Sequence, residues 1–210
     1  MWLISLSLLC CTMYAEDKGK QIKRNNVAVE MALTSDDTYS LESGYRFNLL
    51  HSLSAGVSLG YWKTFTEHFP HGQNWCVSDD YRKVSNFYLR PNVMLTTPKL
   101  FGIRYCKFGL YANPGVMLNI PNAKADIDIV EPNVYHDGVS NNKGKWCAFD
   151  VRCGLMFGMD NINITIGYQF STIDVYGMHR NLLYKGTRFE DFYPKRKYQY
   201  GAVIGISYGF

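Results

Sequence analysis

The chain has 210 residues and a formal net charge of +4, so it is long enough for one domain and only mildly basic. Its 16 tyrosines and 18 glycines exceed ordinary globular usage. The mean hydropathy of -0.19 is too polar for a bundle of membrane helices, and the small net charge does not favour a nucleic-acid partner.

The first fifteen residues, MWLISLSLLCCTMYA, are apolar and uncharged, and charged residues follow directly. We predict that residues 1–15 form a secretory signal peptide cleaved after Ala15, although no basic residue precedes its apolar core. Residues 16–25 would then form a short N-terminal segment in the periplasm. The remainder, residues 26–210, is expected to be one domain.

Eight segments alternate apolar and polar residues, which is the pattern of strands with one apolar face. They cover residues 27–33, 41–49, 52–62, 84–95, 103–118, 147–158, 162–170 and 199–210. Most are near the length of about 9–11 residues at which a tilted strand crosses a bilayer. Pro91 would be unfavourable in a central strand, so a bulge or local break is expected there.

The spacers between these strands alternate in length. Those after the first, third, fifth and seventh strands hold the length, and the others are turns. Short periplasmic turns and long extracellular loops produce this asymmetry in membrane barrels. Both ends of the mature chain would then lie on the periplasmic side.

The polar face of the strands indicates which way the apolar face points. It carries three acidic and four basic side chains: Glu30, Glu42, Asp150, Arg46, Arg90, Lys107 and Arg152. Such a nearly balanced set suits an enclosed network in which each charge finds a partner, because unpaired buried charges are costly. We therefore expect a polar barrel interior and a lipid-facing apolar exterior, and not a soluble barrel with an apolar interior.

The last strand ends on an aromatic residue, and its apolar face carries Tyr200, Ile204, Ile206, Tyr208 and Phe210. This strand resembles the C-terminal strand that the insertion machinery reads in bacterial outer-membrane β-barrels. With the eight-strand rhythm and the loop asymmetry, the chain resembles the transmembrane domain of outer membrane protein A and its short relatives. The resemblance implies an all-β, eight-stranded antiparallel up-and-down transmembrane barrel, exported to a Gram-negative outer membrane.

No residue pattern points to catalysis. The lipid A deacylases of the resembled architecture use a His and a Ser two apart on one strand, and this sequence has no such pair, since His51 and Ser52 are adjacent in a turn. The other histidines are expected at the surface of loops: His68, His71, His136 and His179. No third metal ligand accompanies them at a useful spacing, so no metal, cofactor or catalytic residue is predicted.

We therefore predict a non-enzymatic protein with an envelope-structural or surface-interaction role exerted through its extracellular loops. An enzyme that modifies outer-leaflet lipid is the alternative from another class. A small diffusion pore is a weaker alternative, because eight strands leave little lumen. The sequence does not identify the extracellular ligand.

Two features of the loops remain open. Cys76 and Cys147 each follow a tryptophan, and a disulfide between them would tie two loops together, although spacing cannot fix connectivity. The last long loop carries six basic residues among tyrosines: Arg180, Lys185, Arg188, Lys195, Arg196 and Lys197. They would pair with phosphates of an anionic outer-leaflet glycolipid, or belong to the charged and aromatic girdle of any such barrel.

Overall fold

The computed structural model describes residues 23–35, 37–98, 100–103, 106–129 and 135–210. The predicted signal peptide, residues 1–15, and most of the predicted periplasmic segment 16–25 lie outside the described residues. Within the described part of the chain, no helix is long and apolar enough to cross a membrane.

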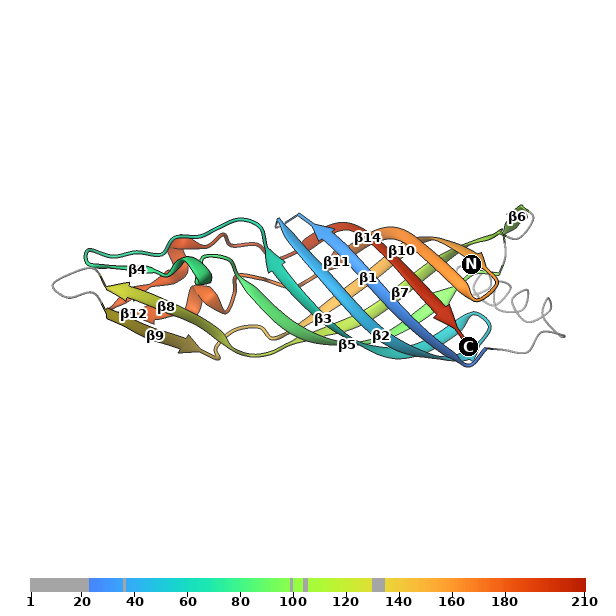
Figure 1. Cartoon of the computed structure of the whole chain (residues 1–210), viewed down its shortest axis with the longest axis horizontal. Coiled ribbons are helices and arrows are strands. Elements are labelled where there is room, and N and C mark those ends of the chain that lie inside the picture. Colours follow the sequence, from blue (N-terminus) through green and yellow to red (C-terminus); the bar gives the residue numbers. More distant parts are fainter. Residues whose placement is uncertain (1–22, 36, 99, 104–105, 130–134) are drawn as a thin grey trace, which may run out of the picture.

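Eight long antiparallel strands close into a barrel (Figure 1). They are β1 (Asn25–Thr34), β2 (Thr38–Leu50), β3 (Leu53–Thr64), β5 (Ser85–Thr96), β7 (Cys106–Asn119), β10 (Cys147–Met159), β11 (Ile162–Ser171) and β14 (Gln199–Gly209). Each pairs with the next in the chain, and β14 pairs with β1 to complete the ring. A short strand, β6 (Phe101–Ile103), extends the hairpin that leads into β7. The predicted all-β, eight-stranded antiparallel barrel is confirmed.

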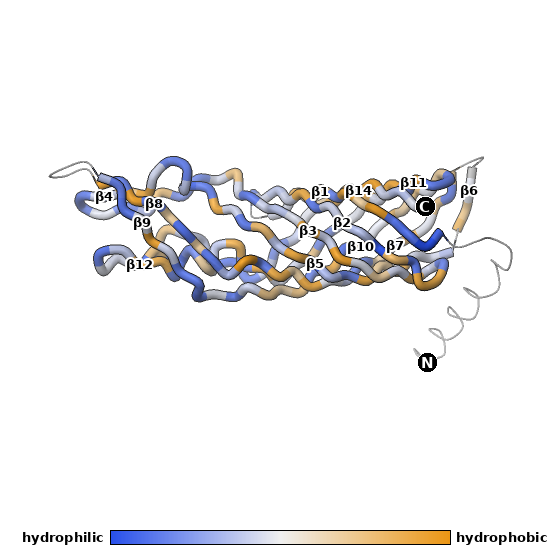
Figure 2. The backbone as a smooth tube through the Cα atoms, turned by 60° about the horizontal axis from the view of Figure 1, so that its bottom comes forward, coloured by the Kyte–Doolittle hydropathy of each residue, from blue (hydrophilic) through white to orange (hydrophobic). Residues whose placement is uncertain are grey.

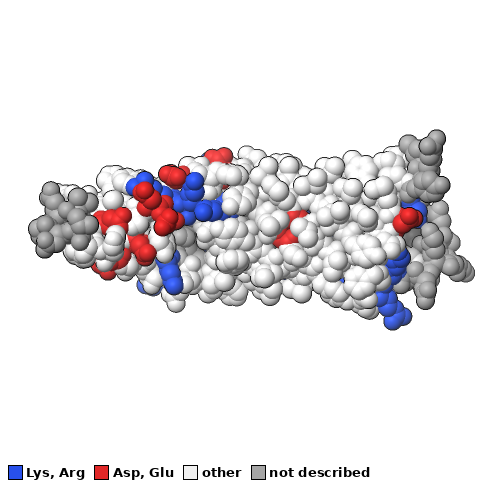
Figure 3. Space-filling view, in the orientation of Figure 1, with Lys and Arg blue, Asp and Glu red and all other residues white. Residues whose placement is uncertain are grey.

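The apolar side chains of the barrel strands point outward, as predicted, and Figure 2 shows apolar and polar positions mixed along these strands. In β14, Ile204 and Ile206 are about half exposed, whereas their neighbours Val203 and Ser207 are buried. The wall visible in Figure 3 carries almost no charge between charged groups at the two ends. A continuous apolar wall of this extent is unfavourable in water and favourable in hydrocarbon.

Pro91 lies beside a gap in one ladder of its strand and leaves the other ladder unbroken. β5 keeps an unbroken register with β3 through the pair Val57–Pro91. Its ladder with β7 keeps one register but lacks pairs at residues 90–91 and 93–94. The expected bulge is therefore absent, and the expected local break is confined to the β5–β7 seam, because proline cannot donate a ladder hydrogen bond.

The spacers after β3, β7 and β11 fold into a cap at the end of the barrel opposite the C-terminus (Figure 1). The first spacer, which was also expected to be long, covers only residues 35–37 between β1 and β2. The cap contains a three-stranded sheet, in the order β4 (Trp75–Val77), β8 (Ala123–Ile129) and β9 (Tyr135–Asn141), and a small hairpin of β12 (Leu183–Tyr184) and β13 (Thr187–Arg188). Three short 3-10 helices complete it: η1 (Asp79–Tyr81), η2 (His179–Asn181) and η3 (Phe189–Phe192).

The cap has an apolar core, which the sequence analysis did not predict. Alternate residues of β8 point into it, and Ile127 and Ile129 are fully or almost fully buried. They pack with apolar residues of the last loop, among them Leu182 and Phe189. The long spacers therefore form a packed unit, because their own apolar residues are numerous enough to bury one another.

Candidate functional site

Arg152 is the centre of an ionic network inside the barrel. From β10 its guanidinium donates to Glu30 of β1 and to Oε2 of Glu42 of β2, the latter at 2.7 Å. Its Nε lies 3.5 Å from Oδ1 of Asp150. One arginine therefore contacts carboxylates from three strands, and its side chain is 1% exposed.

Two further arginines balance the remaining charge. Arg90 donates through Nε to Oδ1 of Asp150 at 3.0 Å, and its Nη1 lies 3.6 Å from Oε1 of Glu42. Arg46 donates to Oε1 of Glu30. The network thus holds three arginines and three carboxylates, and this balance is what makes so many buried charges tolerable.

Six of the seven residues that we predicted for the interior lie in this network, and Lys107 does not. Lys107 lies near the start of β7, is exposed, and lines the open mouth at the turn end of the barrel. Uncharged side chains complete the network instead: Tyr88 donates to Oε2 of Glu42 at 2.9 Å, and Asn92 accepts from Arg46 at 3.1 Å. The alternation of β5 already placed both inward.

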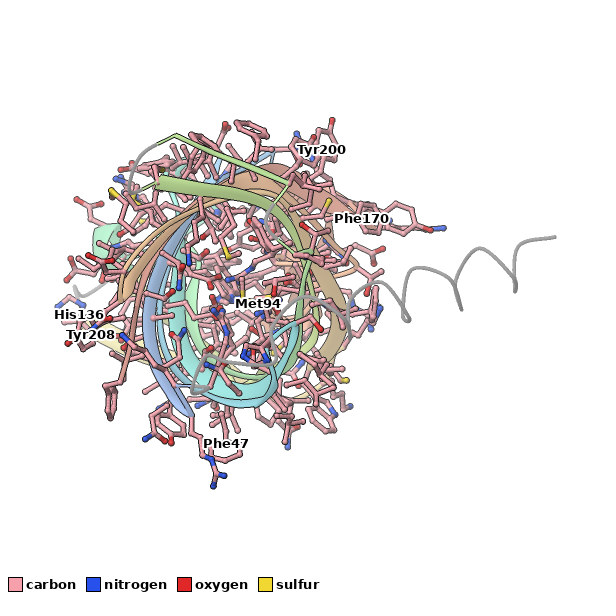
Figure 4. All side chains as sticks on the ribbon, turned by 90° about the vertical axis from the view of Figure 1, so that its right-hand side faces the viewer. Phe47, Met94, His136, Phe170, Tyr200 and Tyr208 are labelled. Carbon is pink, nitrogen blue, oxygen red and sulfur yellow. The ribbon has the colours of Figure 1, made fainter. Side chains whose placement is uncertain are left out.

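Two cavities of unequal size lie in the barrel interior. At the turn end a cavity of about 770 Å³ opens outward, with Asn48, Asn163 and Ser207 on its wall and Met94 in its lining. Figure 4 looks into this end, where side chains fill the barrel and Met94 lies near the centre. At the cap end only about 10 Å³ remains, between Trp62 and residues of the last loop. The side chains of the ionic network lie between these two cavities, at the level of Glu42 and Arg46 on β2.

Aromatic rings hold the cap together. Trp75 of β4 stacks on Phe189 with ring centroids 5.7 Å apart and meets Tyr184 edge-on at 5.1 Å. These contacts join the second long loop to the last one. Such ring pairs stabilise beyond their buried area, so the two loops belong to one packed unit.

Two histidines pack around Tyr193 within the cap. The ring of His68 lies 5.0 Å from the Tyr193 ring and that of His179 lies 5.9 Å from it. The prediction of a surface position is wrong for His179, which is 8% exposed, because the last loop folds back over it. Burial lowers the pKa of His179 to about 4, and repulsion from His68 adds to the shift.

One contact among Ser, Asp and His side chains in the cap lacks the geometry of a catalytic triad. Ser78 donates to Oδ1 of Asp128, and His136 bonds the same oxygen at 2.7 Å. In a serine hydrolase the serine must instead donate to the histidine, which acts as the base. Among these residues no three His, Cys, Asp or Glu side chains gather as a metal site either.

The predicted disulfide is absent: Cys76 and Cys147 are both free thiols. Cys76 pairs in register with Asp128 of β8, and Cys147 pairs with Leu118 of β7. Cys76 therefore lies in the cap sheet, and Cys147 lies at the start of a barrel strand.

The basic residues of the last loop mostly find partners within the cap. Arg180 pairs with Asp174 and donates to the carbonyl of Pro194 at 2.5 Å. Lys195 lies 2.6 Å from Glu190, and further contacts involve Arg188 with Glu190, Lys185 with the Tyr184 ring and Arg196 with the carbonyl of Ser35. Part of this charge therefore stabilises the cap.

No protein-family model matches the chain, and comparison with curated proteins finds no relative. Its fold is similar to that of a de novo designed transmembrane β-barrel, with 12% identity and a TM-score of 0.48 over 91% of this chain and 98% of that one. It is also similar to Neisserial surface protein A, with 11% identity and a TM-score of 0.43 over 89% and 95% of the two chains. The outer membrane enzyme PagL has 12% identity and a TM-score of 0.42 over 88% and 99%. The likeness is one of barrel fold alone.

Proposed function

We propose that the protein is a non-enzymatic outer-membrane barrel that displays a rigid recognition surface outside the cell. The observation that carries this proposal is the cap, in which the long loops share one apolar core. Loops that only cover a barrel need no common core. A packed unit holds its surface groups in fixed positions, which lowers the entropic cost of binding a partner.

Three further features support this role. The apolar wall fits a bilayer, and the cap lies opposite the C-terminus. The ionic network blocks the lumen, which argues against the pore alternative. We further propose that the chain reaches the outer membrane through the periplasm and that the insertion machinery reads its final strand. Outer-membrane lipid, including anionic glycolipid, would contact the wall and its rim.

The orientation of the cap can be tested with thiol labelling of intact cells. Cys76 lies in the cap and is half-buried, and Asp160 lies in the exposed turn between β10 and β11. We would compare two variants with one cysteine each: one keeps only Cys76, and the other lacks the native cysteines and carries Asp160→Cys. A membrane-impermeant maleimide should label Cys76 on intact cells, and Asp160→Cys only after the outer membrane is permeabilised. The reverse pattern would refute the proposal.

The closed lumen can be tested in planar bilayers. The purified protein should give no steady conductance, because the ionic network and the cap fill the path. A steady, large conductance would refute that conclusion and favour the pore. Mass spectrometry of outer-leaflet lipid from a deletion strain addresses the enzyme alternative, and we expect no change.

A further inference from the structure

β9 is an edge strand that leaves most of its side chains exposed. It lies at the end of the sheet order β4–β8–β9, in the part of the cap farthest from the barrel (Figure 1). Four of its seven residues in succession, from Tyr135 to Gly138, are exposed, whereas alternate residues of the neighbouring β8 are buried. Among the described residues, β9 thus has a strand partner on one side only.

The backbone of β9 offers hydrogen-bonding groups on its open side. Ser78 donates from its backbone N–H to the carbonyl of Asp126 at 2.9 Å, so the backbone groups of Asp126 point toward β4. Because the backbone N–H and C=O of Asp126 point toward β4, they do not bond β9, and the residue of β9 opposite Asp126 does not bond β8. That residue is Gly138. Gly138 and its alternate neighbours His136 and Ser140 therefore direct their N–H and C=O groups away from β8.

Most of these outward N–H and C=O groups have no hydrogen-bond partner among the described residues. The exception is the N–H of Gly138, which donates to Oδ1 of Asp137 at 2.8 Å. Soluble proteins usually protect such edges. Here one donor of three is protected, and a strand that adds to the edge would use the others.

The outer face of the same sheet is acidic. Asp126 and Asp128 alternate along β8 on the face opposite the cap core, and Figure 3 shows acidic groups gathered in this part of the cap. His136 bonds Asp128 at 2.7 Å, and Lys124 is the basic residue on this face of β8. Several carboxylates thus lie beside the open edge.

Gly138 leaves a passage from the open edge to Asp126. The two residues are opposite each other, and a Cβ atom placed on Gly138 would have one neighbour within 4 Å, which is Oδ1 of Asp126 at 3.8 Å. A long side chain from an added strand can therefore cross Gly138 without obstruction. A lysine or arginine has the required length, charge and donors.

We infer that the edge of β9 binds an extended, cationic segment of a partner protein, which adds to the sheet as a fourth strand. Its backbone bonds the outward groups of His136 and Ser140, and a basic side chain crosses Gly138 to Asp126. A second copy of this chain is not the occupant, because two such edges would bring like charges together. The inference rests on the proposed function in one respect, namely that the cap faces the cell exterior.

A peptide-binding experiment on the purified full-length protein in detergent tests the inference. The probe is a fluorescent peptide of alternating lysine and threonine, compared with the same peptide carrying glutamate for lysine. A third peptide keeps the lysines but has alternate backbone nitrogens methylated, which removes its ladder donors. We expect saturable binding of the lysine peptide by fluorescence anisotropy, and binding weaker by roughly tenfold or more for both other peptides.

Variants of the protein locate the site. Asp126→Asn keeps the side-chain oxygen and removes the charge, Gly138→Val closes the passage, and Ser140→Pro removes an outward donor without touching the β8 ladder. Each should weaken binding by roughly tenfold. Glu67→Gln is the matched control, since Glu67 is an exposed carboxylate of the loop after β3 that pairs with Lys83. It should bind as the original protein does.

Equal binding of the lysine and glutamate peptides, or undiminished binding of the methylated peptide, would overturn the inference. So would crosslinking of two copies through a cysteine at position 140. Gel mobility before and after boiling checks that each variant is folded, and Asp126→Asn provides a conservative test if Ser140→Pro fails to fold. Because the assay is done in detergent, its outcome is independent of the thiol labelling that tests cap orientation.

Discussion

Replacing Arg152 by methionine should strongly destabilise the barrel at neutral pH. Arg152 contacts Glu30, Glu42 and Asp150, all within the barrel interior. Methionine retains much of the apolar volume and removes the charge. The interior then holds two arginines against three carboxylates, so one negative charge lacks a partner in a place that water does not reach.

The expected magnitude follows from the simplest relief of that charge, which is protonation of one carboxylate. An ordinary glutamate has a pKa of about 4.3, so protonation at pH 7 costs about 4 kcal/mol, from 2.7 units at about 1.36 kcal/mol each. This agrees with the roughly 3–5 kcal/mol measured when buried pairs are broken. At pH 5 the same step costs about 1 kcal/mol, so the variant should recover most of its relative stability in acid.

Urea unfolding in detergent micelles, followed by tryptophan fluorescence at pH 7 and pH 5, measures both values. The double variant Arg152→Met/Glu42→Gln restores the charge balance and should recover more than half of the loss at pH 7. Lys83→Met is the surface control, because Lys83 pairs with Glu67 at 3.2 Å where both are well exposed, and it should change stability by less than about 1 kcal/mol. An Arg152→Met protein as stable as the original at pH 7, or a double variant no better than the single one, would refute the reasoning.

Three further predictions concern the cap and the interior packing. His179 has a pKa of about 4 in the folded protein and about 6.5 when unfolded, so the unfolded cap binds more protons between these two pH values. The stability of the cap should therefore fall by up to about 3 kcal/mol as the pH drops from 6.5 to 4. Hydrogen exchange of the cap measures this fall, and His179→Phe should remove it. Ile127→Ala should weaken the cap by about 2–5 kcal/mol, while the barrel keeps its heat-modifiable gel mobility. Loss of the folded barrel band would show that the barrel depends on the cap and would contradict the prediction. Gly60→Ala should destabilise the barrel by about 1–3 kcal/mol, because its Cβ would clash with the Tyr88 ring; Gly109→Ala, whose nearest atom would lie 3.3 Å away, should cost clearly less in urea unfolding.

The barrel could be predicted from the sequence because alternation determines which side chains share a face. In β14 the outward set of Tyr200, Ile204 and Ile206 follows directly from the period of two. Closure of the sheet into a barrel could be predicted from the polar face of the strands. Charges such as Arg90 and Asp150 would have no partner on a lipid-exposed surface, so they must lie inside. Both predictions depend only on the alternation within each strand, which is clear when the strand is long.

The cap could not be predicted because alternation does not say what covers an apolar face. The segment 123–129 alternates as clearly as the barrel strands do, yet alternation alone does not show that β4 and β9 lie beside it in a separate sheet. The burial of His179 and the separation of Cys76 from Cys147 both depend on how the loops pack on one another. The alternation of β7 places Lys107 on the polar face, but it does not say whether that residue lies in the buried part of the lumen or at the open mouth, where the structure has it.

The ionic network also constrains the order in which the barrel assembles. Arg152 is separated from Glu30 by 122 residues and from Glu42 by 110, whereas Arg46 is the one network arginine that lies on the first two strands with these two acids. The first hairpin alone would therefore hold two carboxylates against one arginine, and one negative charge would lack a counterion in hydrocarbon. Arg90 of β5 and Arg152 of β10 supply the missing charge only when the later strands are in place, which favours insertion that is coupled to ring closure.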